Sequence, residues 1–443
     1  MTHPLTFPRG GIQLPAGGQE SRRVPIVNAA MPPVAAVPMR RFGGPAAACL
    51  VASGDQVAEG QLIARSAGPG SAPVHAPIPG SVAGIRDILL PDGTSGPAAL
   101  IELGGAFARS GRPGSRRVWT RLGPAETLAI VRDAGVAVGR LGPLAGRLEA
   151  ARSRQVQVLV ANAVESEPWL AAEYRTLVER PAEVAEGLRA AQALLGCGRV
   201  VLAVTVEAAP AAEGVAAAFG SMDGALEVAV FDRRYPQEDE TCLAAALLGG
   251  EPARGGTALD AGAMVIDVSS LAAMYDAVVL GRPCIERVVT VAGPAVREVR
   301  NLKVRVGTRA GELVEEAGGL VAKPAAVVFG SAMQGHAFPG DADWQEVPVT
   351  QEVSALLLLA RRDLGRGRQR PCLRCGRCLD ACPWGLVPVR LHELAGSGAL
   401  AQASAECLEA CTGCGCCSYR CPSRIPVAAG LREARARPVG GAG

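Results

Sequence analysis

Ten of the 14 cysteines fall between Cys372 and Cys421, and eight of them form two runs with one shared spacing. The runs read Cys372-x2-Cys375-x2-Cys378-x3-Cys382-Pro383 and Cys411-x2-Cys414-x2-Cys417-x3-Cys421-Pro422. In two-cluster ferredoxins the first three thiolates of such a run bind one 4Fe–4S cubane, and the fourth binds the neighbouring cubane. The spacing therefore predicts two clusters with crossed ligands: Cys372, Cys375, Cys378 and Cys421 for the first, and Cys382, Cys411, Cys414 and Cys417 for the second.

Other uses of these thiols fit the pattern less well. Structural zinc takes four cysteines as two separated pairs, not as two unbroken runs with a trailing proline. A disulfide framework conflicts with a cytoplasmic chain. A shifted ligand set that uses Cys407 and Cys416 would break the symmetry of the two runs. Two clusters held close together suit the relay of electrons better than catalysis, so we expect an electron-transfer protein.

The rest of the composition excludes several functions. The chain has 443 residues, enough for two to four domains, and its net charge of +3 with scattered arginines gives no reason to expect nucleic acid. Its longest apolar run, residues 354–360, is far shorter than the roughly 20 residues of a membrane-spanning helix. The N-terminus lacks the basic and apolar regions of a signal peptide. We therefore expect a cytoplasmic protein that reaches a membrane only through partner subunits.

Changes in composition divide the chain into four regions. Residues 1–118 are rich in Gly, Pro and Val with short apolar runs, which predicts a small all-β unit. Residues 119–290 alternate strand-like and helix-like segments, which predicts an α/β sheet with parallel strands. Residues 291–345 predict a compact α+β unit, and residues 346–443 predict a helical unit around the cysteines.

Individual elements can also be located. The strands expected in the α/β unit are residues 156–160, 200–206, 226–231 and 264–266. A linker is expected at residues 338–343, helices from about residue 350 onward, and a disordered tail at residues 438–443.

Several segments outside the cysteines match one family. They include FPRGGI at residues 7–12, VASGDQVAEGQLIA at 51–64, APVHAPIPGSV at 72–82 and YPQ at 235–237. On these segments and others the chain resembles RnfC, the peripheral subunit of the Rnf-type ion-translocating electron transport complex, over essentially its whole length. The resemblance implies that the first region is a barrel-sandwich hybrid, a relative of lipoyl domains. Residues 74–77 carry no lysine, so it implies a docking module.

The α/β region carries the segment NAVESEP at residues 162–168, after the strand expected at 156–160, where α/β sheets place ligands. The segment is similar to a motif of the flavin-binding subunit of respiratory complex I, which lines the FMN and NADH site there. The resemblance implies that Asn162 hydrogen-bonds the flavin edge and that Glu165 and Glu167 position the nicotinamide or tune the flavin. Taken alone, the segment also fits an ordinary strand end that leads into a turn.

Residues 301–302, 307–308 and 330–335 (GSAMQG) resemble the family's soluble-ligand-binding β-grasp domain. No polar cluster there requires a ligand, so a packing role is expected for this third region. The fold predicted for the whole chain is therefore multidomain, α/β and α+β: a barrel-sandwich hybrid, a complex-I flavoprotein-like α/β domain, a β-grasp domain and a helical two-cluster ferredoxin-like domain.

One loop departs from the family. The family binds the flavin phosphate with a loop that reads roughly GLGGAGFPT, where bare backbone amides approach the phosphate. The corresponding residues 134–146 read AGVAVGRLGPLAG, without the paired glycines, and Pro143 removes an amide donor. In addition, residues 267–270 read DVSS where the family usually has NVGT.

Two functions remain open at this point. In the first, the chain belongs to an NADH-oxidising, ion-translocating complex: FMN accepts hydride from NADH, and two 4Fe–4S clusters carry single electrons to the next subunit. In the second, it is a non-catalytic iron–sulfur adaptor with a degenerate flavin domain, and its partner is a membrane-bound or soluble reductase. The altered loop favours the second function, and the retained NAVESEP segment favours the first.

Overall fold

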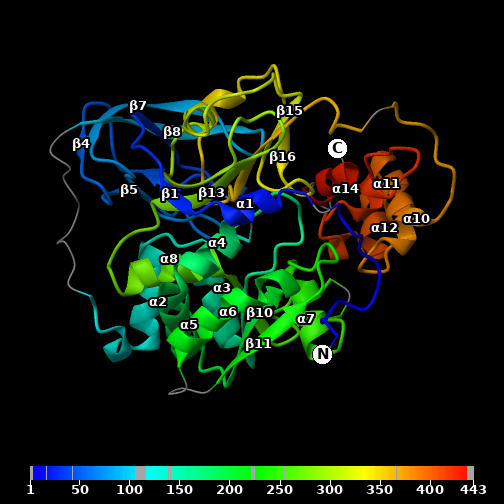
Figure 1. Cartoon of the computed structure of the whole chain (residues 1–443), viewed down its shortest axis with the longest axis horizontal. Coiled ribbons are helices and arrows are strands. Elements are labelled where there is room, and N and C mark those ends of the chain that lie inside the picture. The colour runs from blue at the N-terminus through cyan, green and yellow to red at the C-terminus, as the bar shows by residue number, and fades with distance from the viewer. Residues whose placement is uncertain are drawn as a thin grey trace.

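The fold is that of a computed structural model. It describes residues 3–15, 17–41, 43–104, 116–137, 139, 141–220, 225–253, 255–365 and 367–436. The tail at 438–443, expected to be disordered, lies outside the described residues, as do Val138 and Arg140 of the loop at 134–146. In Figure 1 the sheets of the first and third regions lie together, the α/β part lies below them, and the cysteine-rich helices lie to one side.

The N-terminal region forms two small antiparallel sheets, of order β2-β8-β7-β4 and β3-β5-β6. Their strands are β2 (Val34–Pro38), β3 (Ala48–Cys49), β4 (Gln56–Val57), β5 (Leu62–Arg65), β6 (Val74–His75), β7 (Gly80–Leu89) and β8 (Ser95–Leu103). Apolar side chains from both sheets, Ile63 and Ile101 among them, form one buried core because alternate residues of each strand face inward. The expected all-β structure is found for residues 34–103; before them, Gln19–Arg23 form a helix and Ile26–Asn28 pair with a strand at residues 301–303.

The α/β region contains a four-stranded parallel sheet of order β11-β10-β9-β12. Its strands are β9 (Val158–Asn162), β10 (Arg199–Thr205), β11 (Leu226–Phe231) and β12 (Ala263–Asp267), each within two residues of the expected span. Its helices are α2 (Pro124–Asp133), α3 (Leu144–Ser153), α4 (Ala172–Glu179), α5 (Pro181–Leu195), α6 (Ala209–Phe219), α7 (Glu240–Leu248) and α8 (Val268–Val278). Helices α2, α3, α5, α6 and α8 share a core with one face of the sheet, and α7 with the other. Burial on both faces explains the nearly unbroken Val and Ala runs of these strands.

The carboxyl ends of these strands meet at one edge of the sheet. Asn162 ends β9, and Asp267 at the end of β12 is its direct neighbour in the ladder. Strands β10 and β11 continue from one side of β9, whereas β12 lies on the other side. In open α/β sheets the ligand site lies outside the carboxyl ends at such a switch point, so Asn162 and Asp267 flank the expected position of a site.

A third sheet has the order β1-β14-β13-β17-β15-β16, with β13 parallel to β17. Its elements are β1 (Ile26–Asn28), β13 (Glu286–Ala292), β14 (Arg300–Arg305), β15 (Ala326–Phe329), β16 (His336–Pro339) and β17 (Ala355–Leu359), with helix α9 (Ala310–Glu316) and the single turn η3 (Trp344–Glu346). Two expectations are wrong here. Phe338 and Pro339 belong to β16 rather than to a linker, and residues 355–359 form a strand rather than a helix.

Strand β17 explains the apolar run at 354–360. It pairs with both β13 and β15 in the middle of the sheet, and Ala355, Leu356, Leu357 and Leu358 are all buried. A short, continuous apolar run cannot be told from a buried helix by its periodicity alone, because both faces are covered. The sheet therefore takes strands from both sides of the boundaries expected at residues 290 and 345, and the division into four domains stays a prediction.

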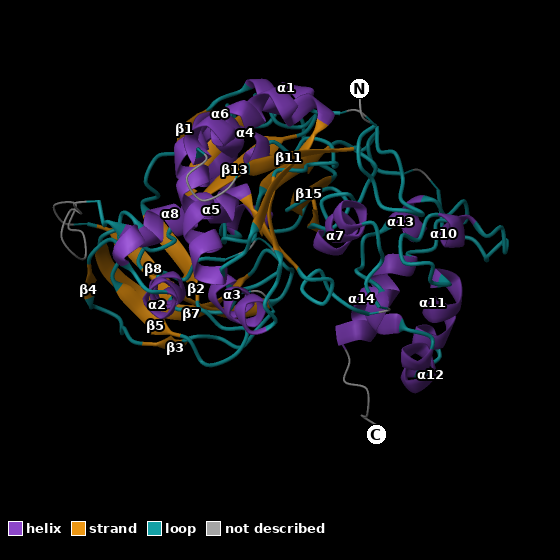
Figure 2. Ribbon diagram, turned by 90° about the horizontal axis from the view of Figure 1, so that it is seen from below, coloured by secondary structure: helices purple, strands orange, loops and turns teal. Residues whose placement is uncertain are grey.

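The cysteine-rich region is a small group of helices at one end of the molecule (Figures 1 and 2). They are α10 (Arg377–Asp380), α11 (Pro388–Gly396), α12 (Leu400–Ala405), η4 (Leu408–Ala410), α13 (Cys416–Tyr419) and α14 (Val427–Ala436). Leu391 and Leu394 of α11 share a core with Leu431 of α14 and with several of the cysteines. The remaining elements are α1 (Gln19–Arg23), η1 (Trp119–Arg121) and η2 (Val206–Ala208). Within the described ranges, none of the helices has the length and apolar character needed to cross a bilayer.

Candidate functional site

Each cysteine run consists of a loop followed by a short helix. In the second run Cys411 and Cys414 lie in the loop, Cys417 lies in α13, and Cys421 follows it. The residue before α13, Gly415, has φ +88°, and Gly376 before α10 has φ +75°. Only glycine adopts this left-handed backbone readily, so these two positions let each loop fold back toward its helix. All eight cysteines of the two runs are free thiols.

The fourth cysteine of the first run lies among the thiols of the second. Burial raises the pKa of the Cys382 thiol to about 11, and the nearby Cys414 and Cys411 thiols add to the shift. Burial likewise raises the pKa of Cys417 to about 12, with contributions from Cys414, Cys411 and Cys382. These effects place Cys382 within electrostatic range of Cys411, Cys414 and Cys417, and they place Cys416 near Cys414 and Cys417 as well. We call Cys382, Cys411, Cys414 and Cys417, the set that the spacing predicts, the inner four cysteines.

The other four cysteines lie nearer to solvent. Cys372 and Cys375 are exposed, and Cys378 and Cys421 are partly buried. Ser423 donates its hydroxyl hydrogen bond to Pro371 O (2.8 Å), which holds the segment around Cys421 beside the start of the first run. We call Cys372, Cys375, Cys378 and Cys421 the outer four cysteines.

Both groups have the donor set of a 4Fe–4S cluster, because each offers four free thiols. In the described part of the chain, no three or more His, Cys, Asp or Glu side chains are arranged to hold a single metal ion. A cubane needs a wider arrangement of ligands than a single metal ion, because each of the four thiolates binds a different iron. The residues present therefore fit two cubanes, and their binding of iron stays a prediction.

The inner four cysteines pack against the α/β unit through the N-terminal segment. Gly11 N donates to Ala381 O (3.0 Å), and the Tyr235 hydroxyl donates to Cys414 O (2.5 Å) in a fully buried position. A Cβ on Gly10, whose φ is +65°, would lie 2.4 Å from Cys382 O. Gly10 therefore allows the backbone to lie directly on the cysteine-rich region, whereas a Cβ on Gly11 would meet Phe7 and Tyr235 O.

The structure engages the polar atoms of Asn162 and Glu165 within the protein. Asn162 Nδ2 donates to Glu238 O (3.1 Å), and its Oδ1 accepts from Val164 N (3.0 Å). Glu165 is buried, and its two carboxylate oxygens accept from the N–H groups of Glu173 (3.0 Å) and Tyr174 (3.2 Å) in the first turn of α4. Burial raises the pKa of Glu165, which these amides oppose. Glu165 thus stabilises the start of a helix.

Glu167 connects three parts of the molecule. Its Oε2 accepts from Met333 N (2.7 Å) in the loop between β15 and β16. Met333 O in turn accepts from Arg432 Nη2 on α14 (3.3 Å). The buried carboxylate therefore joins the α/β unit to the third sheet and, through Met333, to the cysteine-rich helices.

Sequence reasoning missed the role of two residues at this edge, Gln237 and Glu238. Both follow Tyr235, at a segment that resembles the family; Gln237 is buried and Glu238 is partly exposed. Burial raises the pKa of Glu238 to about 8, and the negative charge of Glu167 raises it further. Among the described residues, Gln237 Nε2 and Oε1 and Glu238 Oε1 have no hydrogen-bond partner. Their position directly after Tyr235, in a segment that resembles the family, was the sequence signal that could have identified them.

The loop at 134–146, whose sequence departs from the family's phosphate-binding loop, makes several contacts within the protein. Leu144 N, the first amide of α3, donates to Val136 O (2.9 Å), and Pro143 has no N–H to offer. Gly135 lies against the N-terminal sheets, where a Cβ would be 2.8 Å from Pro73 O. Ala134 O accepts from Cys284 N (2.9 Å) and Ala137 O accepts from the Ser270 hydroxyl, which holds the first part of the loop to the protein, whereas Gly142 and Gly146 line an open hollow.

Side chains of the protein itself accept hydrogen bonds from the first amides of α8. Asp267 accepts from Ser270 N (2.7 Å), and the Ser269 N–H and hydroxyl both donate to the carboxylate of Glu173 (2.8 Å each). Burial raises the pKa of Glu173 to about 8, and the charge of Asp267 adds to the effect. Two carboxyl groups thus lie where helix amides would receive an anion. Together with the loop, this arrangement does not fit a flavin phosphate.

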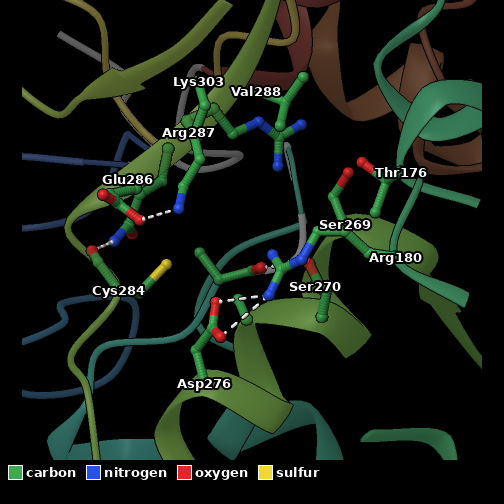
Figure 3. Close-up of a pocket in the computed structure, with 14 residues that line it drawn as sticks. Thr176, Arg180, Ser269, Ser270, Asp276, Cys284, Glu286, Arg287, Val288 and Lys303 are labelled. Carbon is green, nitrogen blue, oxygen red and sulfur yellow. Dashed lines mark hydrogen bonds and ion pairs between the residues drawn. The ribbon is translucent and has the colours of Figure 1, made fainter. Parts of the chain in front are cut away.

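A small open hollow lies between α8 and the β13–β14 hairpin (Figure 3). Its charged residues are largely paired: Arg180 Nη2 contacts both oxygens of Asp276 (3.0 and 3.1 Å), and Lys303 contacts Glu286 (2.6 Å). Arg287 approaches Glu173 at 3.7 Å. None of Asn162, Glu165 and Glu167 lines this hollow.

Comparison with known proteins agrees with the fold and the motifs. Residues 5–106 match the RnfC barrel sandwich hybrid domain, and residues 131–276 match the Nuo51 FMN-binding domain. The chain is 33% identical over 390 residues to a subunit of the proton-translocating ferredoxin:NAD(+) oxidoreductase complex of Clostridium ljungdahlii, covering 87% of this chain and 84% of that one. It is 31% identical over 417 residues to a subunit of the ion-translocating oxidoreductase complex of Rhodobacter capsulatus, covering 91% and 78%.

Among solved structures, the chain is similar to an NAD+-reducing NiFe-hydrogenase in its H2-reduced state, with a TM-score of 0.50 and 18% identity over 71% of this chain and 60% of that one. At this identity the similarity concerns the fold. The barrel-sandwich N-terminus, the Nuo51-like α/β domain and the cysteine-rich C-terminal region follow the expected order. With such relatives along most of its length and the family's own N-terminal domain, the chain belongs to the RnfC family.

Proposed function

We propose that this chain is an electron-transfer subunit that relays single electrons through two 4Fe–4S clusters between redox partners. The observation that carries the proposal is that Cys382 lies within electrostatic range of Cys411, Cys414 and Cys417, which supports the crossed grouping predicted from the spacing. A bound 4Fe–4S cluster takes up and releases one electron at a time. The thiols of this chain would hold the two clusters next to each other.

The inner and the outer four cysteines lie in different surroundings. The inner four cysteines pack against the α/β unit through Gly10, Gly11 and Tyr235, and Cys382, Cys414 and Cys417 are buried. The outer four include the exposed Cys372 and Cys375. Electrons would therefore pass between a site on the side of the α/β unit and a partner that docks at the outer four.

We assign the α/β unit a scaffold role within the predicted four-domain order. The hairpin β13–β14, helix α9 and strands β15 and β17 have the arrangement we expect of a β-grasp domain, and the cysteine-rich helices would form the two-cluster ferredoxin-like domain. Asn162, Glu165 and Glu167 support this role through the contacts that they make to backbone atoms. By analogy with its relatives, the chain would be the RnfC subunit of an ion-translocating oxidoreductase complex, held at the cytoplasmic face of the membrane by other subunits.

A second candidate function is NADH oxidation with FMN in the α/β unit. Two observations favour it: residues 131–276 match an FMN-binding domain, and the buried polar atoms of Gln237 and Glu238 at the ligand edge of the sheet have no partner within the described chain. The second function needs a phosphate site other than the loop at 134–146.

Flavin content and reduction separate the two functions. Acid extraction of protein purified without oxygen should release no FMN, even after incubation with excess FMN, and NADH should leave the cluster absorption unchanged. Dithionite should bleach the same absorption, with uptake of about two electrons per chain, one for each cluster. Bound FMN together with bleaching by NADH would establish the second function instead. Failure of dithionite to reduce any iron–sulfur absorption would refute the relay itself.

A further inference from the structure

Exposed arginines gather around the outer four cysteines. Six of them, which we call the arginine face, are Arg368, Arg370, Arg374, Arg377, Arg420 and Arg424. The expectation that arginines are scattered is therefore wrong for this region. The concentration is local, because the whole chain has a net charge of only +3.

Backbone contacts bring the two segments of the arginine face together. Arg370 N donates to Ser423 O (2.9 Å), and the Ser423 hydroxyl donates back to Pro371 O (2.8 Å). The guanidinium of Arg424 lies over Gly365 and Gly367, where a Cβ would be 2.9 and 3.3 Å away. Figures 1 and 2 both draw α10, which begins with Arg377, at the end of the molecule opposite β4. These contacts bring the segment around Arg370 against the segment around Arg424 at this end of the molecule.

The charges of this face are not neutralised within the described chain. None of its six arginines has a carboxylate within 4.0 Å there. Residues 368–379 contain no acidic residue, and Asp380 at the end of α10 is exposed. Uncompensated like charges repel each other, so such a surface gains from a partner with negative charge.

Apolar side chains lie within the same surface. Leu373 is 69% exposed and directly follows Cys372, and Tyr419 is 49% exposed in α13. Leu379 of α10 is also exposed. Large apolar side chains in water beside exposed thiols are costly unless a partner covers them. An apolar centre within a charged rim is the usual anatomy of a protein interface.

We propose that the arginine face is the docking surface for an acidic one-electron carrier protein. This inference rests on the proposed relay function and names its partner. The acidic face of the carrier would pair with the arginines, and its cofactor would come to lie beside the exposed Cys372 and Cys375. One electron then moves between the cluster on the outer four cysteines and the cofactor of the carrier: one is oxidised, the other is reduced, and no atom or proton is transferred.

A protein partner fits this surface better than an anionic membrane. Helices α10 and α13 have four residues each, too short to present the extended apolar stripe of a helix that lies in a membrane surface. The exposed Cys372 and Cys375 lie between Arg370 and Arg377 along the chain, where a carrier gains a short electron path and a lipid surface gains none. Charge complementarity would chiefly raise the association rate, as a transient redox encounter requires.

The test uses the full-length, cluster-loaded chain and a purified acidic bacterial ferredoxin as the probe. The variant R374E/R377E reverses two charges of the face, and R65E/R86E reverses two exposed arginines of the N-terminal sheets as a matched control. Binding measured by surface plasmon resonance should weaken roughly tenfold or more in the first variant and stay within about twofold in the second. Wild-type binding should weaken as salt rises, because screening shortens the range of the interaction.

The outcomes separate this proposal from the relay function. Iron content and cluster absorption are measured first: if the wild type holds no clusters, the relay function fails, whatever binds. If the clusters are present and R374E/R377E binds the ferredoxin as the wild type does, the docking proposal is overturned. Retention of the chain on phosphatidylglycerol vesicles but not by the ferredoxin would overturn it in favour of a membrane. If R374E/R377E loses iron, ferredoxin binding is measured with R374Q/R377Q instead, and binding equal to that of the wild type overturns the docking proposal. Wild-type binding that does not weaken as salt rises overturns it as well.

Discussion

Replacing Tyr235 with phenylalanine removes one hydroxyl group from the junction between the α/β unit and the inner four cysteines. The side chain is fully buried, and its hydroxyl donates to Cys414 O at 2.5 Å. Phenylalanine fills nearly the same volume, so no cavity accompanies the change. The perturbation is therefore the loss of one hydrogen bond to the backbone of a predicted cluster ligand.

The expected magnitude follows from the carbonyl that is left behind. A buried acceptor without a partner costs about 1–3 kcal/mol. If unfolding of this part of the molecule has a urea dependence of about 2 kcal/mol per molar, the midpoint should fall by roughly 1 M. The thiols themselves are untouched, so iron content in the absence of urea should equal that of the wild type.

The assay follows the iron–sulfur absorption during anaerobic urea titration. Tyr275→Phe is the matched control, because Tyr275 is also mostly buried but lies in α8, away from the cysteines. We expect its midpoint to stay close to that of the wild type. An unchanged midpoint in Tyr235→Phe would mean that the hydroxyl does not hold the two parts together. An equal fall in both variants would mean that the effect is not specific to the junction.

Three further changes test other contacts. Gly10→Ala should displace the backbone at Cys382 and lower the iron content. Gly196→Ala is the control, because Gly196 has a similar φ of +70° but open space around it, and this variant should keep its full iron content. Equal iron content in both variants would contradict the structural role given to the FPRGGI segment. Cys382→Ser should alter the electron paramagnetic resonance signal of the same cluster as Cys414→Ser, and changes in two different clusters would exclude crossed ligands. The pKa of Glu238 is raised from 4.5 to about 8, so the neutral carboxyl favours the folded state and stability is lost as pH rises from 4.5 toward 8. In urea titrations above pH 8, Glu238→Gln should therefore regain of the order of 2 kcal/mol of unfolding free energy. A pH profile of stability parallel to that of the wild type would contradict this.

The sequence carried most information where local chemistry dictates structure. The spacing of the cysteine runs determines which thiols share a loop, and Cys382 lies within electrostatic range of Cys411 and Cys414 of the second run, as the predicted crossed ligation would need. The valine-rich strands of the α/β sheet were located within two residues, because both faces of a parallel sheet are apolar and their ends are marked by polar residues. These are short-range signals that need no knowledge of distant partners.

Long-range pairing was less accessible. The strand at residues 26–28 pairs with β14 at residues 301–303, and its amino-acid composition does not predict which strand it pairs with. The run at 355–359 is a strand only because β13 and β15 lie on both sides of it. Glu165 and Glu167 were expected to face a ligand, but a carboxylate that serves the amides of a helix or of Met333 looks the same in sequence. The arginine face likewise depends on Ser423 holding two segments together.

Metal and sulfide analysis of the full-length chain, purified without oxygen, tests the central claim most directly. We expect a brown protein with about eight irons and about eight acid-labile sulfides per chain, and no zinc. Stoichiometric zinc without sulfide, or iron and sulfide near four each, would contradict a pair of cubanes on these eight thiols.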